Sequence, residues 1–516
     1  MDKKPFFIST AIAYVNAKPH VGFALECVMA DAIARYMRMM GRETFFSTGT
    51  DEHGSKIYKT AKDQGIDTKE FCDNNAKSFM ELMQLLNISN TDFIRTSDKK
   101  RHWPSVEKLW NKLVESGDIY KKSYSGLYCE GCETFVLEKD LINGRCQHHA
   151  NRELVRIEEE NYFFKLSKYS DEILRKIESR ELEILPSFRE NEIIAMLKDD
   201  GLKDVSFSRP IKTLPWGVPV PGDDTQNMYV WSDALTNYIS ILDYANEGDN
   251  YKKFWLGGEK VHVIGKDIVR FHAGIWIGML ISAKIPTPNK IVIHGFMTAE
   301  GQKMSKSLGN VVDPFEEVKK YGVDASRYFF LSQVPVGHDY DFSRKIFENI
   351  YNAHLANNLG NYVNRVSVLS EKNSITPDLI PNITSKNKEE FEKEVKAVWS
   401  EVDKEMGEFN IHKAMERIWK FLDFLNKKMD EHKPWLIAKE SPEKLKEIMP
   451  LFLEATRQLS YLLDSFIPAT AEKIRNILGV ANATTLEEKQ TWYGQKNWKK
   501  LGEKQILFPR LETGEK

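Results

Sequence analysis

The sequence predicts an α/β protein with a parallel sheet that is split by an insertion and followed by a helical bundle. Three observations support this prediction. In the first 115 residues, short apolar and β-branched runs alternate with stretches of helical periodicity, and the alternation returns after about residue 226. After about residue 344 the strand-like runs disappear, and apolar residues recur at helical spacing.

The N-terminal elements follow the order strand, turn, helix, strand. Residues 6–13 form a short apolar and β-branched run, and apolar residues between Val21 and Met37 recur at helical spacing. Residues 43–47 predict a second strand, with residues 51–54 as the loop at its C-terminal end. Because strands that are joined by a helix usually run parallel, this order predicts a parallel sheet.

The second half of the chain supplies two more strands, at residues 261–264 and 290–294. The intervening residues break the alternation with clustered cysteine and histidine, followed by three prolines. Further on, apolar residues from Ile411 to Met429 mark one face of a long helix, as in a helical bundle. We therefore divide the chain into the first half of an α/β domain, an insertion, the second half of that domain and a helical domain, at residues 1–115, 116–225, 226–343 and 344–516.

Composition excludes several classes of protein. With 41% hydrophobic and 29% charged residues, the chain is neither disordered nor of low complexity. A net charge of -2 excludes a uniformly basic nucleic-acid coat protein. Five cysteines are too few for a disulfide scaffold, and the N-terminus lacks the apolar core of a signal peptide. The longest uncharged apolar run, residues 271–283, is shorter than the ~20 residues of a membrane span. We expect a cytoplasmic monomer without a membrane partner.

Two motifs point to a polyphosphate ligand. His20 and Gly22 lie between a predicted strand and a helix N-terminus, where backbone N–H groups bind phosphate. Such a motif by itself is usually a plain turn. Residues 303–307 read Lys-Met-Ser-Lys-Ser in a loop after the strand that ends near His294, and two lysines at this spacing suit a flexible clamp on a polyphosphate. The motifs follow strands of the two sheet halves, where open α/β sheets bind ligands.

Four residues in the insertion have the spacing of a zinc site. They form the pattern C-x2-C-x13-C-x2-H, which fits a closed, tetrahedral, structural zinc; inert thiols are the alternative. The residues are Cys129, Cys132, Cys146 and His149. His148 is adjacent and its spacing also fits. Cys27 and Cys72 lie on helical patterns, so we expect them to be buried as small apolar residues.

The helical region contains three candidate RNA-binding residues. Asn361 and Arg365 are four residues apart and share a helix face. Trp435 follows a helix-breaking proline and can present its ring as a stacking platform for an unstacked base. A solvated helix face and a core tryptophan are the commoner roles of such residues, so the pattern alone leaves both interpretations open.

These motifs resemble a known family. His20-Val-Gly-Phe23 resembles the HIGH signature of class I aminoacyl-tRNA synthetases, and residues 303–307 are the KMSKS signature unaltered. Four further stretches, and the chain from about Phe6 to Pro509, are similar to the methionyl-tRNA synthetase family; the stretches are residues 11–16, 49–54, 231–234 and 264–272. The family usually has a second histidine where this chain has Phe23, and Leu235 stands where some members have proline.

The resemblance implies a Rossmann-like catalytic domain, a zinc-containing insertion and an anticodon-binding bundle. It implies a methionine–tRNA ligase that forms methionyl-adenylate from methionine and ATP and transfers it to tRNA(Met), with Mg²⁺ accompanying ATP and one structural Zn²⁺ per chain. His20, Lys303 and Lys306 would be catalytic, and ATP would be bound by His20, Gly22, Phe23, Lys303, Ser305 and Lys306. Asp51 would hold the methionine ammonium, and Arg209 would help order the site. The side-chain pocket would be formed by Ile12, Tyr14, Trp231, Ala234, Tyr238, Ile268 and His272. Asn361, Arg365 and Trp435 match the family's anticodon-reading residues.

Two other functions are compatible with the motifs. A class I synthetase for leucine, isoleucine, valine or cysteine would keep both signatures. The short insertion argues against the first three, because synthetases of those families are expected to have a large editing domain at that place. A zinc-containing RNA-binding protein on a catalytically degenerate fold is the second alternative. The intact residues 303–307 argue against it, and Phe23 is the feature in its favour.

Overall fold

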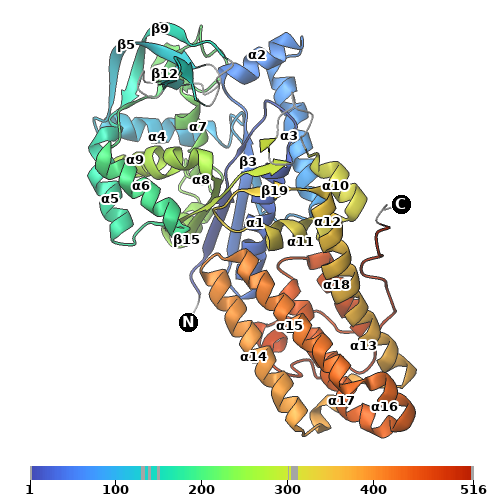
Figure 1. Ribbon diagram of the computed structural model, residues 1–516. Helices are drawn as coiled ribbons and strands as arrows, with labels where there is room; N and C mark the ends of the chain where they lie inside the picture. The colour runs from blue at the N-terminus through green and yellow to red at the C-terminus, as the bar shows by residue number, and fades with distance from the viewer. Residues whose placement is uncertain are drawn as a thin grey trace. The chain divides into compact units, whose positions relative to one another are not determined.

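A computed structural model of the chain describes residues 3–129, 134–136, 141–147, 152–299, 302–303 and 312–512. The chain forms two compact units (Figure 1). The first comprises Met1–Pro19, Thr44–Gln84 and Asn90–His294, and the second comprises His20–Glu43, Leu85–Ser89 and Gly295–Lys516. The division of the sequence into four segments stays a prediction. In the described part of the chain, no helix has the length and apolar character needed to cross a membrane.

The first unit is built on a seven-stranded sheet in which every strand pair is parallel. The strand order is β10-β16-β15-β1-β3-β2, and β4 also pairs with β3. The strands are β1 (Phe6–Thr10), β2 (Ala13–Tyr14), β3 (Thr44–Asp51), β4 (Asp92–Arg95), β10 (Glu183–Leu185), β15 (Glu259–Gly265) and β16 (Lys290–His294). All residues of β1 are buried, as expected for a parallel strand that is covered on both faces. The predicted parallel sheet is confirmed.

Strand β15 pairs directly with β1, so the two sheet halves that are far apart in the sequence form one continuous sheet. Register places Phe6 opposite Glu259 and Thr10 opposite Val263. The carboxyl ends of β1, β3 and β15 therefore lie at the same edge, followed in the chain by the residues predicted to bind the substrate. Strand β10 comes from within residues 116–225, so this segment contributes an edge strand to the parallel sheet as well as an insertion.

The other strands that come from the insertion pair in antiparallel fashion. A four-stranded sheet has the order β11-β9-β5-β6, a three-stranded sheet has the order β12-β14-β13, and β7 pairs with β8. The strands are β5 (Ile119–Cys129), β6 (Thr134–Val136), β7 (Leu141–Ile142), β8 (Arg145–Cys146), β9 (Val155–Phe164), β11 (Val205–Ser206), β12 (Ser208–Pro210), β13 (Pro219–Val220) and β14 (Asp223–Met228).

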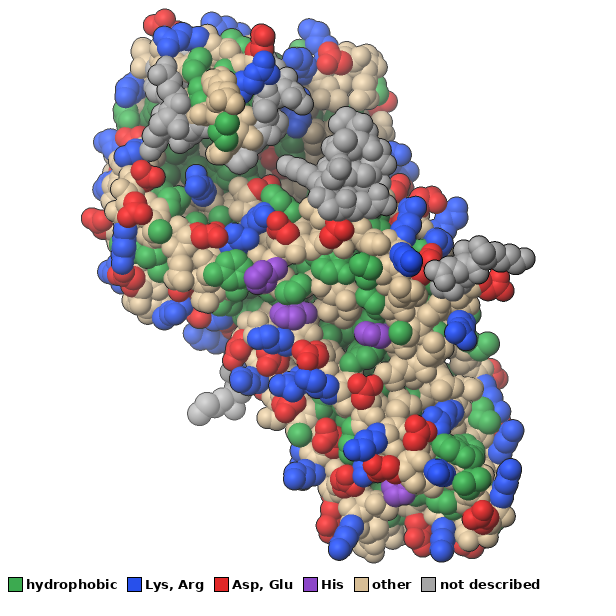
Figure 2. Space-filling model, viewed as in Figure 1, with side chains coloured by type: hydrophobic (Ala, Val, Ile, Leu, Met, Phe, Trp, Pro, Cys, Tyr) green, Lys and Arg blue, Asp and Glu red, His purple; other side chains and the backbone are tan. Residues whose placement is uncertain are grey.

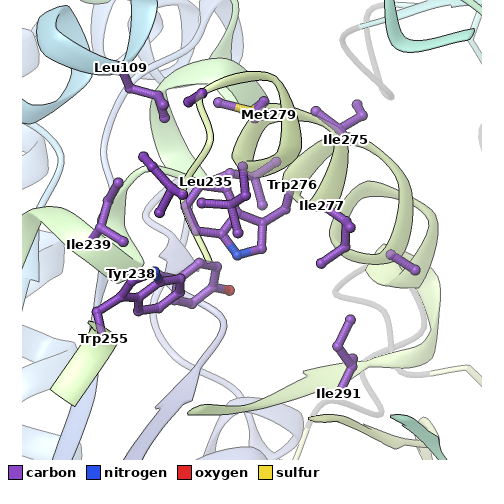
Figure 3. Packing of buried hydrophobic residues seen from close by; sticks show 14 of the residues in the cluster. Leu109, Leu235, Tyr238, Ile239, Trp255, Ile275, Trp276, Ile277, Met279 and Ile291 are labelled. Carbon is purple, nitrogen blue, oxygen red and sulfur yellow. The ribbon is translucent and has the colours of Figure 1, made fainter. Parts of the chain in front are cut away.

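A buried apolar cluster joins the parallel sheet to the helices of the first unit. Phe7 and Ile264 come from the sheet, and Trp110 and Ile277 come from helices. Figure 3 shows part of this cluster, including Trp276 and Tyr238. The helices of this unit are α2 (Ser55–Asp63), α3 (Thr68–Leu85), α4 (Trp103–Glu115), α5 (Ser170–Glu178), α6 (Ser187–Asp199), α7 (Val230–Ala234), α8 (Asn237–Ser240) and α9 (Ile277–Ser282).

The second unit is mainly helical. Its long central helix, α17, is buried at almost every position from Leu445 to Leu463, as expected for a helix surrounded by others. A small sheet of order β18-β17-β19 precedes the bundle. The elements are α1 (Val21–Met39), β17 (Met297–Ala299), β18 (Gln302–Lys303), α10 (Pro314–Tyr321), α11 (Val323–Gln333), β19 (Tyr340–Phe342), α12 (Arg344–Ile350), α13 (Asn361–Lys372), α14 (Lys386–Gly407), α15 (Ile411–His432), α16 (Pro434–Glu440), α17 (Pro442–Leu463), α18 (Pro468–Leu478) and α19 (Leu486–Gln490).

A buried ion pair fixes α1 within the second unit. The Arg327 guanidinium of α11 lies 2.6 Å from the Asp31 carboxylate of α1, and both side chains are fully buried. Arg327 also donates to the backbone oxygens of Leu86 and Phe466. Burial by itself raises the pKa of the Asp31 carboxyl, but Arg327, Arg35 and Ser89 outweigh it and lower the pKa. The pair therefore stays charged, and it holds the helix whose N-terminus carries the first predicted phosphate motif.

Candidate active site

The first motif forms the N-terminus of α1. His20 is the N-cap residue, and its Nδ1 accepts a hydrogen bond of 3.1 Å from the Gly22 N–H. In the neutral ring the proton is then on Nε2, and since the His20 side chain is exposed, Nε2–H can donate to a ligand. A side chain at position 22 would place its Cβ only 2.9 Å from the His20 ring, so glycine lets the ring take this capping position. Phe23 is only 8% exposed and packs inward.

The second motif is described only at its start. Lys303 ends β18, and its backbone pairs with Thr298 of β17. Ser305 and Lys306 lie outside the described residues, as does the rest of the predicted clamp. Their role stays a prediction from the sequence.

Asp51 ends β3 at the carboxyl edge of the parallel sheet, and it is 9% exposed. Its neighbour in the sheet is Tyr14 of β2, and the Val15 N–H donates to the Asp51 carbonyl at 3.1 Å. The structure therefore brings together Tyr14 and Asp51, two residues that the family resemblance assigns to one site. Gly49 permits this local packing, because a Cβ there would lie 2.1 Å from the Ile94 carbonyl oxygen of β4.

Aromatic rings bring three further predicted residues together. The Trp231 ring of α7 stacks on Phe271 with a centroid distance of 3.9 Å and an interplanar angle of 4°. The edge of His272 faces Trp231 at 6.3 Å, and Tyr238 of α8 lies 5.7 Å from His272. Figure 3 shows Tyr238 in the buried core beside Leu235 and Ile239. Phe271 was not predicted, although it directly precedes His272 in the motif.

His272 is a neutral, doubly hydrogen-bonded side chain. Its Nδ1 lies 2.9 Å from the carbonyl oxygen of Ile268, which can only accept, so Nδ1 carries the proton. Nε2 then accepts from the Tyr238 hydroxyl at 2.6 Å. Burial lowers the pKa of His272 to about 4. The hydrogen-bonded group of Tyr238, Ile268 and His272 is thus polar but uncharged, and an unpaired charge beside it would be costly to bury.

Two residues beside Asp51 have roles that sequence reasoning missed. The Glu52 carboxylate is buried and accepts hydrogen bonds from the guanidinium of Arg95 at 2.6 and 2.9 Å and from the hydroxyls of Thr50 and Ser97. His53 lies 2.6 Å from a carboxylate oxygen of Asp233, the residue two positions after Trp231. Both belong to stretches that resemble the family, but a residue pattern does not reveal a partner so distant in the chain.

Arg209 is buried in the insertion. Its guanidinium donates to the Ser206 hydroxyl at 2.5 Å and to the Ser208 carbonyl at 2.8 Å. It also lies over the rings of Tyr229 and Tyr128, at 5.0 and 5.7 Å from their centroids. These contacts fix the segment just before Trp231.

Two of the four predicted zinc ligands are described. Cys129 ends β5 and Cys146 ends β8, and they are 0% and 3% exposed. Cys132, His148 and His149 lie outside the described residues. Within the part of the chain that is described, no group of three or more potential ligands has the geometry of a metal site. Cys27 and Cys72 are fully buried on α1 and α3, which confirms the prediction for them.

The helical unit brings the three candidate RNA-binding residues to one surface. The Arg365 guanidinium of α13 lies over the Trp435 ring of α16 at 4.7 Å, and Asp430 accepts a hydrogen bond of 3.0 Å from Arg365. Trp435 is half-buried, and Asn361 is exposed one helical turn before Arg365. Figure 2 shows acidic and basic side chains of the described residues interspersed on one face.

Comparison with known proteins is consistent with this arrangement. Residues 6–153 and 136–367 match the family model of class I tRNA synthetases with the designation M, and residues 388–511 match that of the anticodon-binding domain of tRNA ligases. A parallel sheet with these two signatures and a helical anticodon-binding domain defines a class I aminoacyl-tRNA synthetase.

Comparison with individual relatives shows which class I synthetase family the chain belongs to. The chain is 41% identical over 521 residues to the methionine–tRNA ligase of Fusobacterium nucleatum, covering 99% of this chain and 80% of the relative. It is 39% identical to that of Brucella suis, covering 93% of both. The structure of Mycobacterium tuberculosis methionyl-tRNA synthetase in complex with methionyl-adenylate matches with a TM-score of 0.90 and 35% identity, covering 98% of this chain and 100% of that chain. The chain belongs to the methionyl-tRNA synthetase family, whose activity is that of a methionine–tRNA ligase. This decides against a synthetase for leucine, isoleucine, valine or cysteine.

Proposed function

We propose that this chain charges tRNA(Met) in two steps with the residues described above. In the first step, a carboxylate oxygen of methionine attacks the α-phosphorus of ATP. The bond between the α-phosphorus and the oxygen that bridges to the β-phosphorus breaks, and pyrophosphate leaves. In the second step, a hydroxyl of the terminal ribose of the tRNA attacks the carbonyl carbon of methionyl-adenylate, and AMP leaves. Phosphoryl chemistry of this kind depends on positioning and electrostatic stabilisation rather than on a covalent enzyme intermediate.

The methionine subsite is the part of the proposal with the most structural support. Asp51, at the carboxyl end of β3, would pair with the ammonium group. The side chain would lie against Ile12, Tyr14, Trp231, Ala234, Tyr238, Ile268 and His272. A flexible, polarizable thioether packs well against aromatic edges, which Trp231 and Tyr238 supply. The observation that supports this best is the uncharged hydrogen-bonded wall of His272 and Tyr238.

The ATP subsite would use the N-terminus of α1 and the loop at residues 303–307. His20 can donate from Nε2, and Gly22 leaves the backbone accessible. Phe23 has a hydrocarbon side chain that is buried, so it cannot supply the side-chain hydrogen bond that a second histidine would. His20 would therefore hold ATP without such a partner. Lys303, Ser305 and Lys306 would contact the polyphosphate, with Mg²⁺ neutralising further charge.

The anticodon subsite would lie on α13 and α16. Trp435 would stack on an anticodon base, and Asn361 and Arg365 would hydrogen-bond to base edges. Asp430 supports this role for Arg365, because its carboxylate holds the guanidinium in a defined orientation beside the Trp435 ring. The monomeric state and the cytoplasmic location stay predictions.

The proposed activity is tested by amino-acid-dependent exchange of pyrophosphate into ATP with a panel of amino acids. We expect exchange with methionine far above that with leucine, isoleucine, valine or cysteine, and charging of a tRNA with the CAU anticodon. A folded protein that shows neither reaction would be the catalytically degenerate RNA-binding protein of the second alternative.

We predict about one zinc per chain, held by Cys129, Cys132, Cys146 and His149. The two described ligands fit in their chemistry, because both are buried cysteines, whose thiolates are the sulfur ligands that zinc prefers. The metal would have a structural role, since all four ligand positions are filled by protein. Replacing Cys129 by serine should abolish zinc retention and loosen the insertion, because a closed zinc site contributes folding free energy.

Zinc content after purification without chelator is the measurement. The matched control is Cys72→Ala, another buried cysteine, whose thiol pKa is raised to about 12 mainly by burial, so that it is no thiolate ligand. This variant should retain its zinc. His148→Ala should also retain it, whereas His149→Ala should not. A zinc-free unsubstituted protein would contradict the prediction, and loss with His148→Ala alone would reassign the fourth ligand.

A further inference from the structure

Asp233 lies at the centre of a buried hydrogen-bond network in the first unit. Its two carboxylate oxygens contact His53 Nδ1 at 2.6 Å and His102 Nε2 at 2.8 Å. The Asp233 side chain is 1% exposed, and those of His53 and His102 are 3% and 0% exposed. Both oxygens are thus used within the protein, and the carboxylate is enclosed away from any substrate.

The protons in this network can be assigned from the hydrogen-bond partners. Burial by itself would raise the pKa of the Asp233 carboxyl, but the two histidines outweigh it and lower the pKa to about 2. Asp233 is therefore an anion that only accepts, so His53 Nδ1 and His102 Nε2 both carry hydrogen. Behind His102, Nδ1 lies 2.8 Å from the Ser240 hydroxyl. The rings of Trp103 and Trp216 contact His53 edge-on.

The network joins the two chain segments that form the methionine subsite. His53 is two residues after Asp51, and Asp233 lies between Trp231 and Ala234 on α7. Between Asp51 and His53, Glu52 is itself held by Arg95. These segments are far apart in the sequence, so a direct bond between His53 and Asp233 sets the distance between the ammonium-binding and side-chain-binding parts of the subsite.

We propose that Asp233 is a positioning residue that holds Asp51 and Trp231 in register for methionine binding through its bonds to His53 and His102. The inference rests on the proposed function and extends it to residues that do not touch the substrate. A binding residue that is displaced by a fraction of an ångström contributes much less to substrate binding. Hydrogen bonds from surrounding buried residues prevent such a displacement.

The test is Asp233→Asn, measured by pyrophosphate exchange with methionine and ATP varied separately. The amide has nearly the same shape, but its NH2 group cannot accept from an N–H, so one histidine must change its tautomer or break its bond. We expect KM for methionine to rise about ten- to thirtyfold, the scale of a lost hydrogen bond to a charged group. KM for ATP should change less than about twofold, because this network contains none of the proposed ATP-binding residues.

Asp118→Asn is the matched control. Asp118 is a buried carboxylate of the same unit, and it accepts hydrogen bonds from Tyr169, Lys168 and Ser282, none of which is a proposed substrate residue. Its loss should lower thermal stability, as loss of Asp233 should, but leave KM for methionine unchanged. If both variants change the two KM values alike, Asp233 is a structural carboxylate only and the inference is wrong.

Three further variants cover the case in which Asp233→Asn does not fold. Ser240→Ala removes only the partner of His102 Nδ1 and should raise KM for methionine by a few-fold with KM for ATP unchanged. His102→Gln retains an N–H donor and should keep a lower KM for methionine than His102→Ala. Failure of both expectations overturns the inference. If the unsubstituted protein shows no methionine-dependent exchange, the proposed function fails and this inference fails with it.

Discussion

Replacing Lys306 by alanine is expected to lower the rate of methionyl-adenylate formation by ~10²-fold or more, with methionine affinity nearly unchanged. The reason is that the proposed role of this lysine, in the Lys-Met-Ser-Lys-Ser motif, is to stabilise the negative charge that develops on the polyphosphate as the bond to pyrophosphate breaks. Losing one preorganised stabilising group at such a position typically costs this factor in kcat. Single-turnover formation of the adenylate, with methionine binding measured separately, is the appropriate assay.

Two variants control for the loss of a positive charge and for misfolding. Lys319→Ala removes an exposed cation from α10, shortly after the loop, and should leave adenylate formation close to that of the unsubstituted protein. Lys306→Arg keeps a cation of different geometry and should recover part of the rate. Unchanged exchange in folded Lys306→Ala would remove this loop from the mechanism.

Replacing Trp435 by alanine is expected to weaken tRNA charging roughly ten- to a hundredfold while adenylate formation barely changes. Stacking of a base on an aromatic ring contributes ~1–3 kcal/mol, and Trp435 is half-buried, with part of its surface available. The substitution also removes the ring under the Arg365 guanidinium, 4.7 Å away, and so disturbs a second proposed reader. The measurement is kcat/KM for charging, with pyrophosphate exchange in parallel.

Charging of a tRNA with an altered anticodon separates recognition from packing. A residue that reads the anticodon should lose most of its effect against that tRNA, whereas a core residue should impair both tRNAs alike. Trp435→Phe keeps an aromatic platform and should retain most of the charging. Equal losses on both tRNAs, or a loss of pyrophosphate exchange, would assign Trp435 to packing of the bundle.

Much of the fold could be predicted because the pattern of apolar residues is a local property of the chain. The strand at Lys290–His294 and the helix beginning at Ile411 have the expected bounds, since their burial is one-sided or complete and their periodicity shows it. Strand β10 could not be predicted, because its few residues lie within an irregular segment and become a strand only by pairing with β16.

In the candidate site, too, some features could be predicted from the sequence and others could not. Asp51 could be placed after the second strand, although that strand extends to Asp51 itself and does not end at residue 47. Its pairing with Tyr14 could not be predicted, because β2 has only two residues. The stacking of Phe271 on Trp231 and the bond between His53 and Asp233 could not, because partners some 40 to 180 positions apart meet only when the chain folds. Likewise, the sequence shows Phe23 as a departure from a motif, whereas only packing shows that its ring is buried.

By itself, the sequence determined the α/β class, the main strands and helices of the two sheet halves, the two signature motifs, the zinc-ligand spacing and the family resemblance. These follow from periodicity and from short-range spacing, which need no knowledge of distant contacts. The tertiary structure alone decided that Glu52 is held by Arg95, that burial keeps His272 neutral, and that Asp233 is bonded to His53. The physical reason is that burial and hydrogen-bond partners set a side chain's protonation and orientation, and both are properties of the folded chain.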